Sequence, residues 1–117
     1  MNLLDLTKKR CKPCEGGVKP LERAEAQELL KVLPEWHLSS DGREVVRILV
    51  MEDFLTAVEL INQISRIAEE EDHHPDIRLT GYRNLEIRLS THAIGGLSEN
   101  DFILAGKIEQ LPKKLKA

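Results

Sequence analysis

Two hairpin signals, each flanked by helical patterns, constrain the fold more than any other feature of the sequence. The first spans residues 36–50, where Asp41-Gly42 separates two runs rich in apolar residues. Aspartate followed by glycine permits the positive φ angles of a tight turn between antiparallel strands. The second spans residues 77–89, where apolar and charged residues alternate on both sides of a turn at 81–84, as they do in half-buried strands. The sequence therefore predicts two antiparallel strand pairs.

Three segments with apolar residues at helical spacing alternate with these hairpins. Residues 21–33 predict a first helix, and Pro34 ends the run. Residues 51–71 keep one apolar face and predict a long amphipathic helix. Residues 98–111 predict a last helix by the same spacing. The expected order of elements is αββαββα.

This order predicts the fold class. Each hairpin needs an apolar cover, so three helices pack most simply on one face of a joined four-stranded antiparallel sheet. The fold is therefore expected to be α+β, with Arg78, Glu86 and Arg88 on the charged second face. Residues 1–20 show no sustained apolar period and are expected to form an irregular arm. Residues 21–117 would then form a single domain.

Composition and charge exclude several classes of protein. The 117 residues carry 17 lysines and arginines against 20 acidic residues, a formal charge of -3. No basic surplus exists to bind nucleic acid phosphates, so we expect no direct nucleic acid partner. No apolar run approaches the ~20 residues that a membrane span needs, and the first residues lack the pattern of a signal peptide. We therefore expect a cytoplasmic protein without a membrane partner.

The only two cysteines, Cys11 and Cys14, lie in the expected arm. In a cytoplasmic chain this spacing is typical of half a metal site, a redox pair or two thiols in a loop. The chain has no second cysteine pair and no thioredoxin-like strand and helix after the first. The loop interpretation is therefore favoured, with the other two left open.

Three of the four histidines could meet at one end of the sheet. His73 and His74 follow the long helix, which Pro75 should stop, because proline disfavours helical geometry at the preceding residue. His92 follows the predicted fourth strand, and Asp101 lies in the first turn of the last helix. Imidazole has an ordinary pKa near ~6.5, so it can both give and take a proton at cellular pH. Two such groups can act as acid and base in one turnover.

Each of these residues also has a structural interpretation. His74 could be an exposed helix terminus, and His92 could be a loop residue that is hydrogen-bonded to the backbone. Asp101 fits a capping box that begins at Ser98. Three histidines and a carboxylate also suit zinc, although the adjacent side chains of His73 and His74 diverge. No phosphate loop, serine elbow or dinucleotide motif is present, which favours cofactor-free proton transfer.

Several of these motifs together resemble a known family. Asp72-His73-His74-Pro75, then Ser90-Thr91-His92, then Gly96-Leu97-Ser98-Glu99 with Asp101 resemble the pterin-4a-carbinolamine dehydratases in order and spacing. The resemblance runs from about residue 21 to residue 111. It implies a hydro-lyase that removes water from 4a-hydroxytetrahydropterin and gives the quinonoid dihydropterin, in tetrahydrobiopterin recycling. It also implies that no metal or organic cofactor takes part.

The resemblance assigns roles to single residues. His73 and His92 would transfer protons, with the acid and base labels interchangeable, and His74 would chiefly hold the substrate. Trp36 matches a family tryptophan that is either near the site or packed in the core. The pterin-binding residues would be Asp72, Ser90, Thr91 and Asp101. We further expect a homodimer or homotetramer. The alternative function is a non-catalytic pterin-binding or oligomeric partner protein of the same fold.

Overall fold

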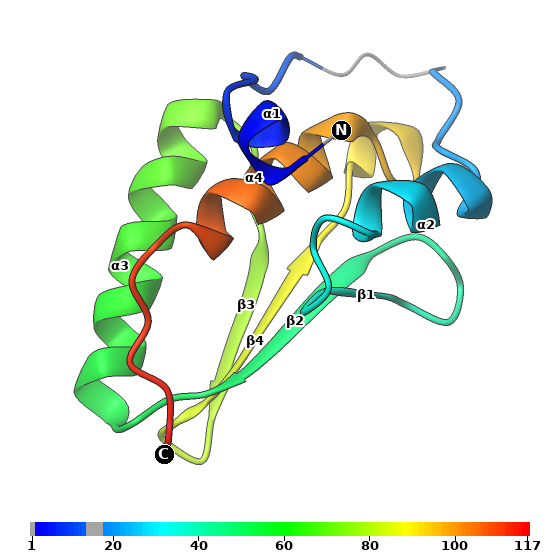
Figure 1. Ribbon diagram of the computed structural model, residues 1–117. Helices are drawn as coiled ribbons and strands as arrows, with labels where there is room; N and C mark the ends of the chain where they lie inside the picture. The colour runs from blue at the N-terminus through cyan, green and yellow to red at the C-terminus, as the bar shows by residue number, and fades with distance from the viewer. Residues whose placement is uncertain (1, 14–17) are drawn as a thin grey trace.

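The computed structural model describes residues 2–13 and 18–117, which form one antiparallel sheet and the helices around it (Figure 1). Cys14 lies outside the described residues. In chain order, the elements are α1 (Leu3–Thr7), α2 (Arg23–Leu30), β1 (His37–Leu38), β2 (Val45–Val50), α3 (Phe54–Glu71), β3 (Asp76–Thr80), β4 (Asn84–Leu89), the short 3-10 helix η1 (His92–Ile94) and α4 (Glu99–Glu109).

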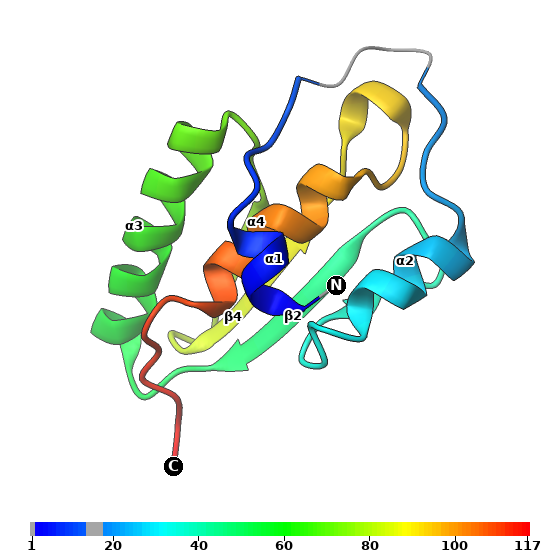
Figure 2. The same ribbon diagram turned by 45° about the horizontal axis from the view of Figure 1, so that its top comes forward.

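The sheet has the strand order β1-β2-β4-β3, and every neighbouring pair is antiparallel. Helices α2, α3 and α4 lie on one face of this sheet (Figures 1 and 2). The predicted α+β class and the predicted order αββαββα are both confirmed, with α1 as an additional helix ahead of them.

The register of the two central strands defines the core. Val45 of β2 pairs with Leu89 of β4, and Leu49 pairs with Leu85. Because side chains alternate along a strand, these residues and Ile87 point to the same face of the sheet. All five are buried beneath the helices. The sheet is thus held by one continuous apolar layer, which fixes where its strand ends lie.

The second face of the sheet is more mixed than expected. Arg78 lies opposite Glu86, and the guanidinium of Arg88 pairs with Glu86 at 3.0 Å, so the three predicted charges are on this face. Ile48 and Val50 of β2 share it, however, and both are exposed. The apolar residues were missed because β2 carries apolar residues on both faces and so shows no alternation of apolar and polar positions.

Helix α3 carries the chain to the histidine pair. Its first turn is capped by Asp53, whose side chain accepts a hydrogen bond from Thr56 N at 2.8 Å. Its buried stripe repeats every three to four residues, at Ala57, Leu60, Ile64 and Ala68. The helix ends at Glu71, and Asp72 adopts a left-handed conformation with φ of +50°. Both histidines therefore follow the cap and begin the loop to β3.

The N-terminal residues differ from the prediction. An irregular arm was expected over residues 1–20, but Leu3–Thr7 forms helix α1, which packs on α4. Leu6 is fully buried in the main core. Gly106 of α4 allows this approach, since a Cβ there would lie 3.1 Å from the Thr7 side chain. A helix of five residues is too short to give a periodic signal, and so it was missed.

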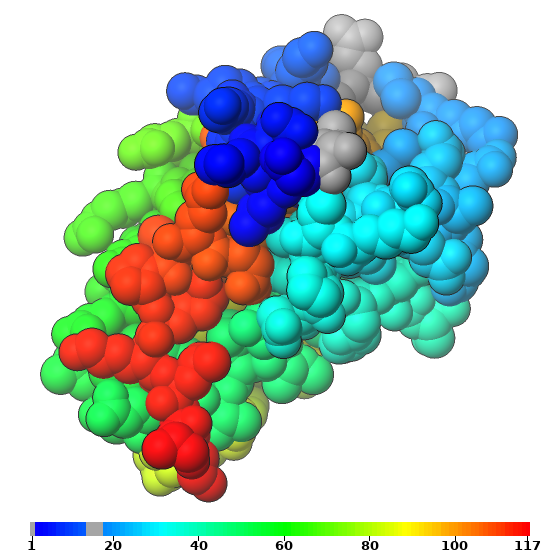
Figure 3. Space-filling view, viewed as in Figure 1, coloured from blue at the N-terminus to red at the C-terminus, as the bar shows by residue number. Residues whose placement is uncertain are grey.

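The covering of α4 is visible in the space-filling view. The blue N-terminal segment lies directly over the orange chain of α4 (Figure 3). Within the described part of the chain, no helix is long and apolar enough to cross a membrane.

Candidate functional site

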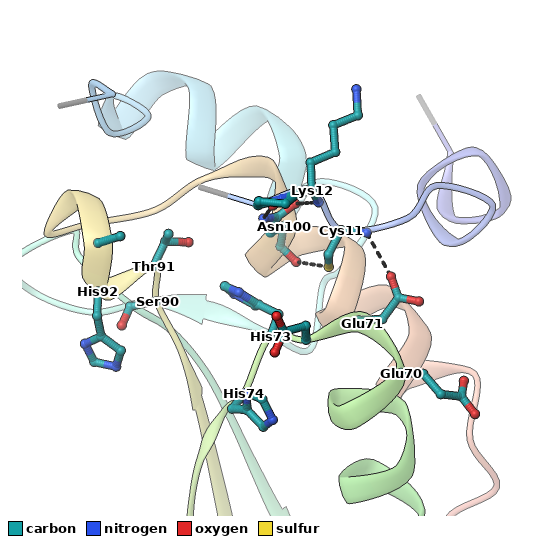
Figure 4. A pocket seen from close by; sticks show the side chains of 13 residues that line it. Cys11, Lys12, Glu70, Glu71, His73, His74, Ser90, Thr91, His92 and Asn100 are labelled. Carbon is teal, nitrogen blue, oxygen red and sulfur yellow. Dashed lines mark hydrogen bonds between the residues drawn. The ribbon is translucent and has the colours of Figure 1, made fainter. Parts of the chain in front are cut away.

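A cavity of about 560 Å³ opens where α3 ends, where β4 ends and where α4 begins. All three predicted catalytic histidines line it, together with Asp72, Ser90 and Thr91 (Figure 4). Residues from the N-terminal segment and from α4 also contribute to the lining: Cys11, Lys12, Pro13 and Asn100. Segments far apart in the sequence thus meet around one hollow at one end of the sheet.

His73 is the most firmly held of the three imidazoles. Its side chain is 12% exposed, and its Nε2 lies 2.6 Å from Oδ1 of Asp101, whose side chain is 0% exposed. The other carboxylate oxygen accepts hydrogen bonds from Ser98 N at 3.0 Å and from Thr91 Oγ1 at 2.9 Å. Because Asp101 accepts on both oxygens, Nε2–H of His73 donates to it. In the neutral ring, Nδ1 is then left as an acceptor.

Asp101 therefore has two roles, of which the sequence suggested the helix cap. Its Oδ2 closes the capping box at the start of α4, and its Oδ1 orients His73. The hydroxyl of Thr91 also belongs to this arrangement, since it bonds Ser98 Oγ at 2.8 Å as well as Asp101. Thr91 is buried, and its hydroxyl helps to hold the Asp101 carboxylate in place. Ser90, the residue before Thr91, lies on the cavity wall.

His74 has a different environment from its neighbour. Its side chain is 54% exposed, and its Nε2 pairs with the exposed carboxylate of Glu69 on the last turn of α3. The two rings point in different directions, as adjacent residues must, yet both reach the cavity. His74 is thus free to change its rotamer with little loss of packing.

His92 faces the histidine pair from the opposite side of the cavity (Figure 4). It opens η1, directly after Thr91, and its side chain is exposed. Within the described chain, its ring makes no hydrogen bond to another residue. The alternative interpretation, a loop residue hydrogen-bonded to the backbone, is therefore not observed, and the ring remains available to a ligand.

Two polar residues of the site were not identified from the sequence. Glu71 is 3% exposed and pairs with Arg10 at 3.0 Å and with Lys107 at 2.9 Å. Burial alone would raise the pKa of Glu71, but hydrogen bonds from Cys11 N and Lys107, with both positive charges, lower it below its ordinary value. Asn100 is buried in the first turn of α4. The run of acids at 69–72 concealed Glu71, because such runs are usually solvated.

Cys11 lies between Glu71 and Asn100 at the edge of the cavity. Burial, reinforced by the charge of Glu71, raises the pKa of its thiol to about 12, so the thiol is neutral at cellular pH. Among residues 2–13 and 18–117, no three histidine, cysteine or acidic side chains are arranged to hold a metal ion.

Trp36 is a core residue and does not line the cavity. Its indole N–H donates to Glu109 Oε1 at 2.8 Å, and the same oxygen pairs with Arg47 at 2.8 Å. Of the two positions that the sequence left open for this tryptophan, the structure shows the core.

The fold and the site together define an α+β protein with a histidine-lined cavity at one end of its sheet. Residues 19–111 match the family model described as pterin 4 alpha carbinolamine dehydratase. The chain belongs to this family, whose members are named as dehydratases, a class of hydro-lyase.

Individual relatives agree with this membership. A relative from Halorhodospira halophila, whose name assigns it to the pterin-4-alpha-carbinolamine dehydratases, is 47% identical over 108 residues, 92% of this chain and 98% of its own. A relative from Nitrosomonas europaea with the same assignment is 45% identical over 113 residues, 96% of this chain and 97% of its own.

A solved structure shares the fold. The crystal structure titled as a transcriptional coactivator/pterin dehydratase from Brucella melitensis is 30% identical to this chain and superposes with a TM-score of 0.72. The match covers 78% of this chain and 96% of that one. The predicted family is therefore confirmed.

Proposed function

We propose that this protein dehydrates a 4a-hydroxytetrahydropterin to the quinonoid dihydropterin by histidine acid and base catalysis. Family membership supports the reaction, because relatives carry the name of this dehydratase. The observation that carries the mechanism is the single cavity lined by His73, His74 and His92, with His73 held by the buried carboxylate of Asp101.

The reaction needs two proton transfers and no redox step. An acid protonates the departing 4a-hydroxyl, and a base removes the proton from the adjacent ring nitrogen, so that a C=N bond forms as water leaves. His73 and His92 stand on opposite sides of the cavity, which suits an acid and a base acting on one flat ring. The charge that develops on His73 would be stabilised by Asp101. His74 would hold the pterin, together with Asp72 and Ser90.

The physiological setting is part of the same proposal. The dehydration would return a pterin, oxidised during hydroxylation of aromatic amino acids, to its recycling route in the cytoplasm. The exposed edge strands β1 and β3 are consistent with a homodimer or homotetramer, which light scattering on the purified protein would establish.

A stopped-flow assay with freshly generated 4a-hydroxytetrahydropterin tests the function. The wild-type protein should accelerate dehydration well beyond the rate in buffer. His92→Ala should lower the rate constant by roughly two to four powers of ten, the usual worth of one acid or base. His37→Ala is the matched control, since His37 is an exposed residue of β1 that does not line the cavity.

Binding without turnover would support the other candidate. The Brucella melitensis relative is titled both as a coactivator and as a dehydratase. A wild-type protein that binds dihydropterin but leaves the dehydration rate at the buffer value would favour a non-catalytic binding role for this chain.

A further inference from the structure

Three residues of the N-terminal segment Arg10–Pro13 form a wall of the cavity, although the segment lies outside residues 19–111, the region that matches the family model. Cys11, Lys12 and Pro13 all contribute to this wall. Figure 4 shows the segment passing close to His73, with Cys11 between Asn100 and Glu71. The segment is therefore next to the residue to which the chemistry is assigned.

The side chain of Asn100 holds the segment through the backbone of Lys12. Its Oδ1 accepts from Lys12 N at 2.9 Å, and its Nδ2 donates to Lys12 O at 2.5 Å. Its own carbonyl accepts from Cys11 Sγ at 3.6 Å. A buried amide that satisfies both backbone groups of one residue fixes the position of that residue closely.

Glu71 holds the other end of the segment. Its Oε1 accepts from Cys11 N at 2.8 Å, and its Oε2 pairs with Arg10 at 3.0 Å. Lys107 of α4 neutralises the same carboxylate at 2.9 Å. Both anchors are close in sequence to the hydrogen-bonded pair of His73 and Asp101, since Glu71 is two residues before His73 and Asn100 directly precedes Asp101.

These contacts decide what kind of surface the segment offers to a ligand. The N–H of Cys11 and both backbone groups of Lys12 are satisfied inside the protein. Pro13 has no N–H, and the Lys12 side chain extends away from the histidines (Figure 4). What remains toward the cavity is a neutral thiol and a proline ring. Such a surface suits the face of a flat heterocycle, whereas the imidazoles opposite suit its polar edge.

We propose that Cys11 and Pro13 form the apolar wall of the pterin site, that Asn100 and Glu71 position this wall, and that it determines how tightly the ring is bound. The inference rests on the proposed function, because the ligand it names is the pterin of that reaction. It adds a binding element outside the family-matched domain, and it makes Asn100 and Glu71 positioning residues.

The first test measures binding. Dihydrobiopterin, which lacks the 4a-hydroxyl and cannot be dehydrated, is titrated into wild type, Asn100→Ala and Glu99→Gln. Asn100→Ala removes both backbone anchors of Lys12 and should raise Kd roughly tenfold or more. It should raise KM by a similar factor and leave kcat within about threefold, since uniform binding is lost rather than acid or base catalysis. Glu99→Gln removes an exposed ion pair with Lys9, which directly precedes the segment, and should leave Kd and KM unchanged.

The second test uses Cys11 as a reporter and needs no destabilising change. In a Cys14→Ser background, Cys11 is the only thiol, and its alkylation by iodoacetamide at mildly alkaline pH is followed by mass spectrometry. Because the raised pKa keeps the thiol largely neutral, this alkylation is slow and is followed over hours. Saturating dihydrobiopterin should slow it further, at least about fivefold, because the ring would cover the thiol. The alkylation rate tests the apolar wall even if Asn100→Ala does not fold.

The outcomes separate the two proposals. Wild-type protein that binds no dihydrobiopterin would refute the proposed function, and the apolar wall with it. Wild-type protein that binds the pterin but leaves Cys11 alkylation unchanged would overturn the wall alone. Equal Kd values for wild type and folded Asn100→Ala would overturn it as well, and a lowered melting temperature with an unchanged Kd would show that the segment only stabilises α4.

Discussion

His73 and His74 are adjacent in the chain but differ in almost every physical property. His73 is largely buried and bonded to a fully buried carboxylate, whereas His74 is half exposed and pairs with the exposed Glu69. A buried, doubly supported aspartate fixes one ring orientation and one tautomer. An exposed pair is screened by water and holds its partners weakly. Burial and hydrogen bonding, rather than residue type, therefore make one histidine suited to proton transfer and the other suited to adapting to a ligand.

The largest expected difference between the two histidines is in turnover. His73→Ala should lower kcat by on the order of 10²–10⁴-fold, because it removes one proton-transfer group. His74→Ala should raise KM and leave kcat within about tenfold, because it removes a contact made equally in the ground and transition states. Steady-state kinetics on both variants measures this, and equal losses of kcat would break the comparison.

The support of His73 is tested by Asp101→Asn. An amide can cap α4 but presents no carboxylate to Nε2, so kcat should fall at least about tenfold and its pH profile should shift. The free energy of unfolding should also fall by about 1–2 kcal/mol, because Ser98 N and Thr91 Oγ1 lose an ionised acceptor. Ser98→Ala, which weakens the same cap but keeps the carboxylate, should lose stability without a comparable loss of kcat.

The buried Glu71, two residues before His73, is expected to make the stability of the protein depend on pH. Glu71→Gln should lower the free energy of unfolding by about 1–3 kcal/mol at neutral pH, because Lys107 and Arg10 lose their shared partner. Since the pKa of Glu71 is lowered in the folded state, its contribution is fully present above the ordinary pKa of 4.5 and is lost as the pH falls through the folded value.

Denaturant unfolding from neutral to strongly acidic pH checks this sign. The stability curves of wild type and Glu71→Gln should converge toward acid. Glu70→Gln is the matched control, since only the backbone carbonyl of Glu70 contacts Arg10, and it should follow wild type throughout. A gap that widens toward acid would show that the pKa is raised instead.

The smallest expected effect is that of Glu69→Gln. Its pair with His74 joins two exposed side chains, and such pairs contribute little in water. The free energy of unfolding should change by less than about 0.5 kcal/mol, in contrast to Asp101→Asn. A loss as large as that of Asp101→Asn, measured under the same conditions, would show that the two histidines are held alike.

Much of the fold could be predicted because its signals are local. Asp41-Gly42 and the alternation from Leu85 to Leu89 depend on neighbouring residues only, and both hairpins appear where expected. Pro75 predicted that the histidines follow the long helix, and α3 ends at Glu71 as expected, with a left-handed Asp72 after it. Helix α1 was not predictable, because one turn of helix gains its stability from packing on α4 rather than from its own sequence.

The candidate site, like the fold, has one part that local sequence motifs predict and another part that they do not. The three histidines and Asp101 are recognisable by motif, and the structure places the histidines on one cavity and Asp101 behind His73. The wall made by Cys11 and Pro13 depends on contacts between residues about 60 and 90 positions apart. No local pattern encodes such contacts, so the sequence did not identify Glu71 or Asn100 as anchors.

The most direct test of the central claim is the single-turnover dehydration of 4a-hydroxytetrahydropterin by the double variant His73→Ala with His92→Ala, compared with wild type and with buffer alone. If these two imidazoles transfer the protons, the double variant should fold normally and show the rate of the buffer reaction. A double variant within about tenfold of wild type would contradict the account, because no acid and base would then be missing from the cavity.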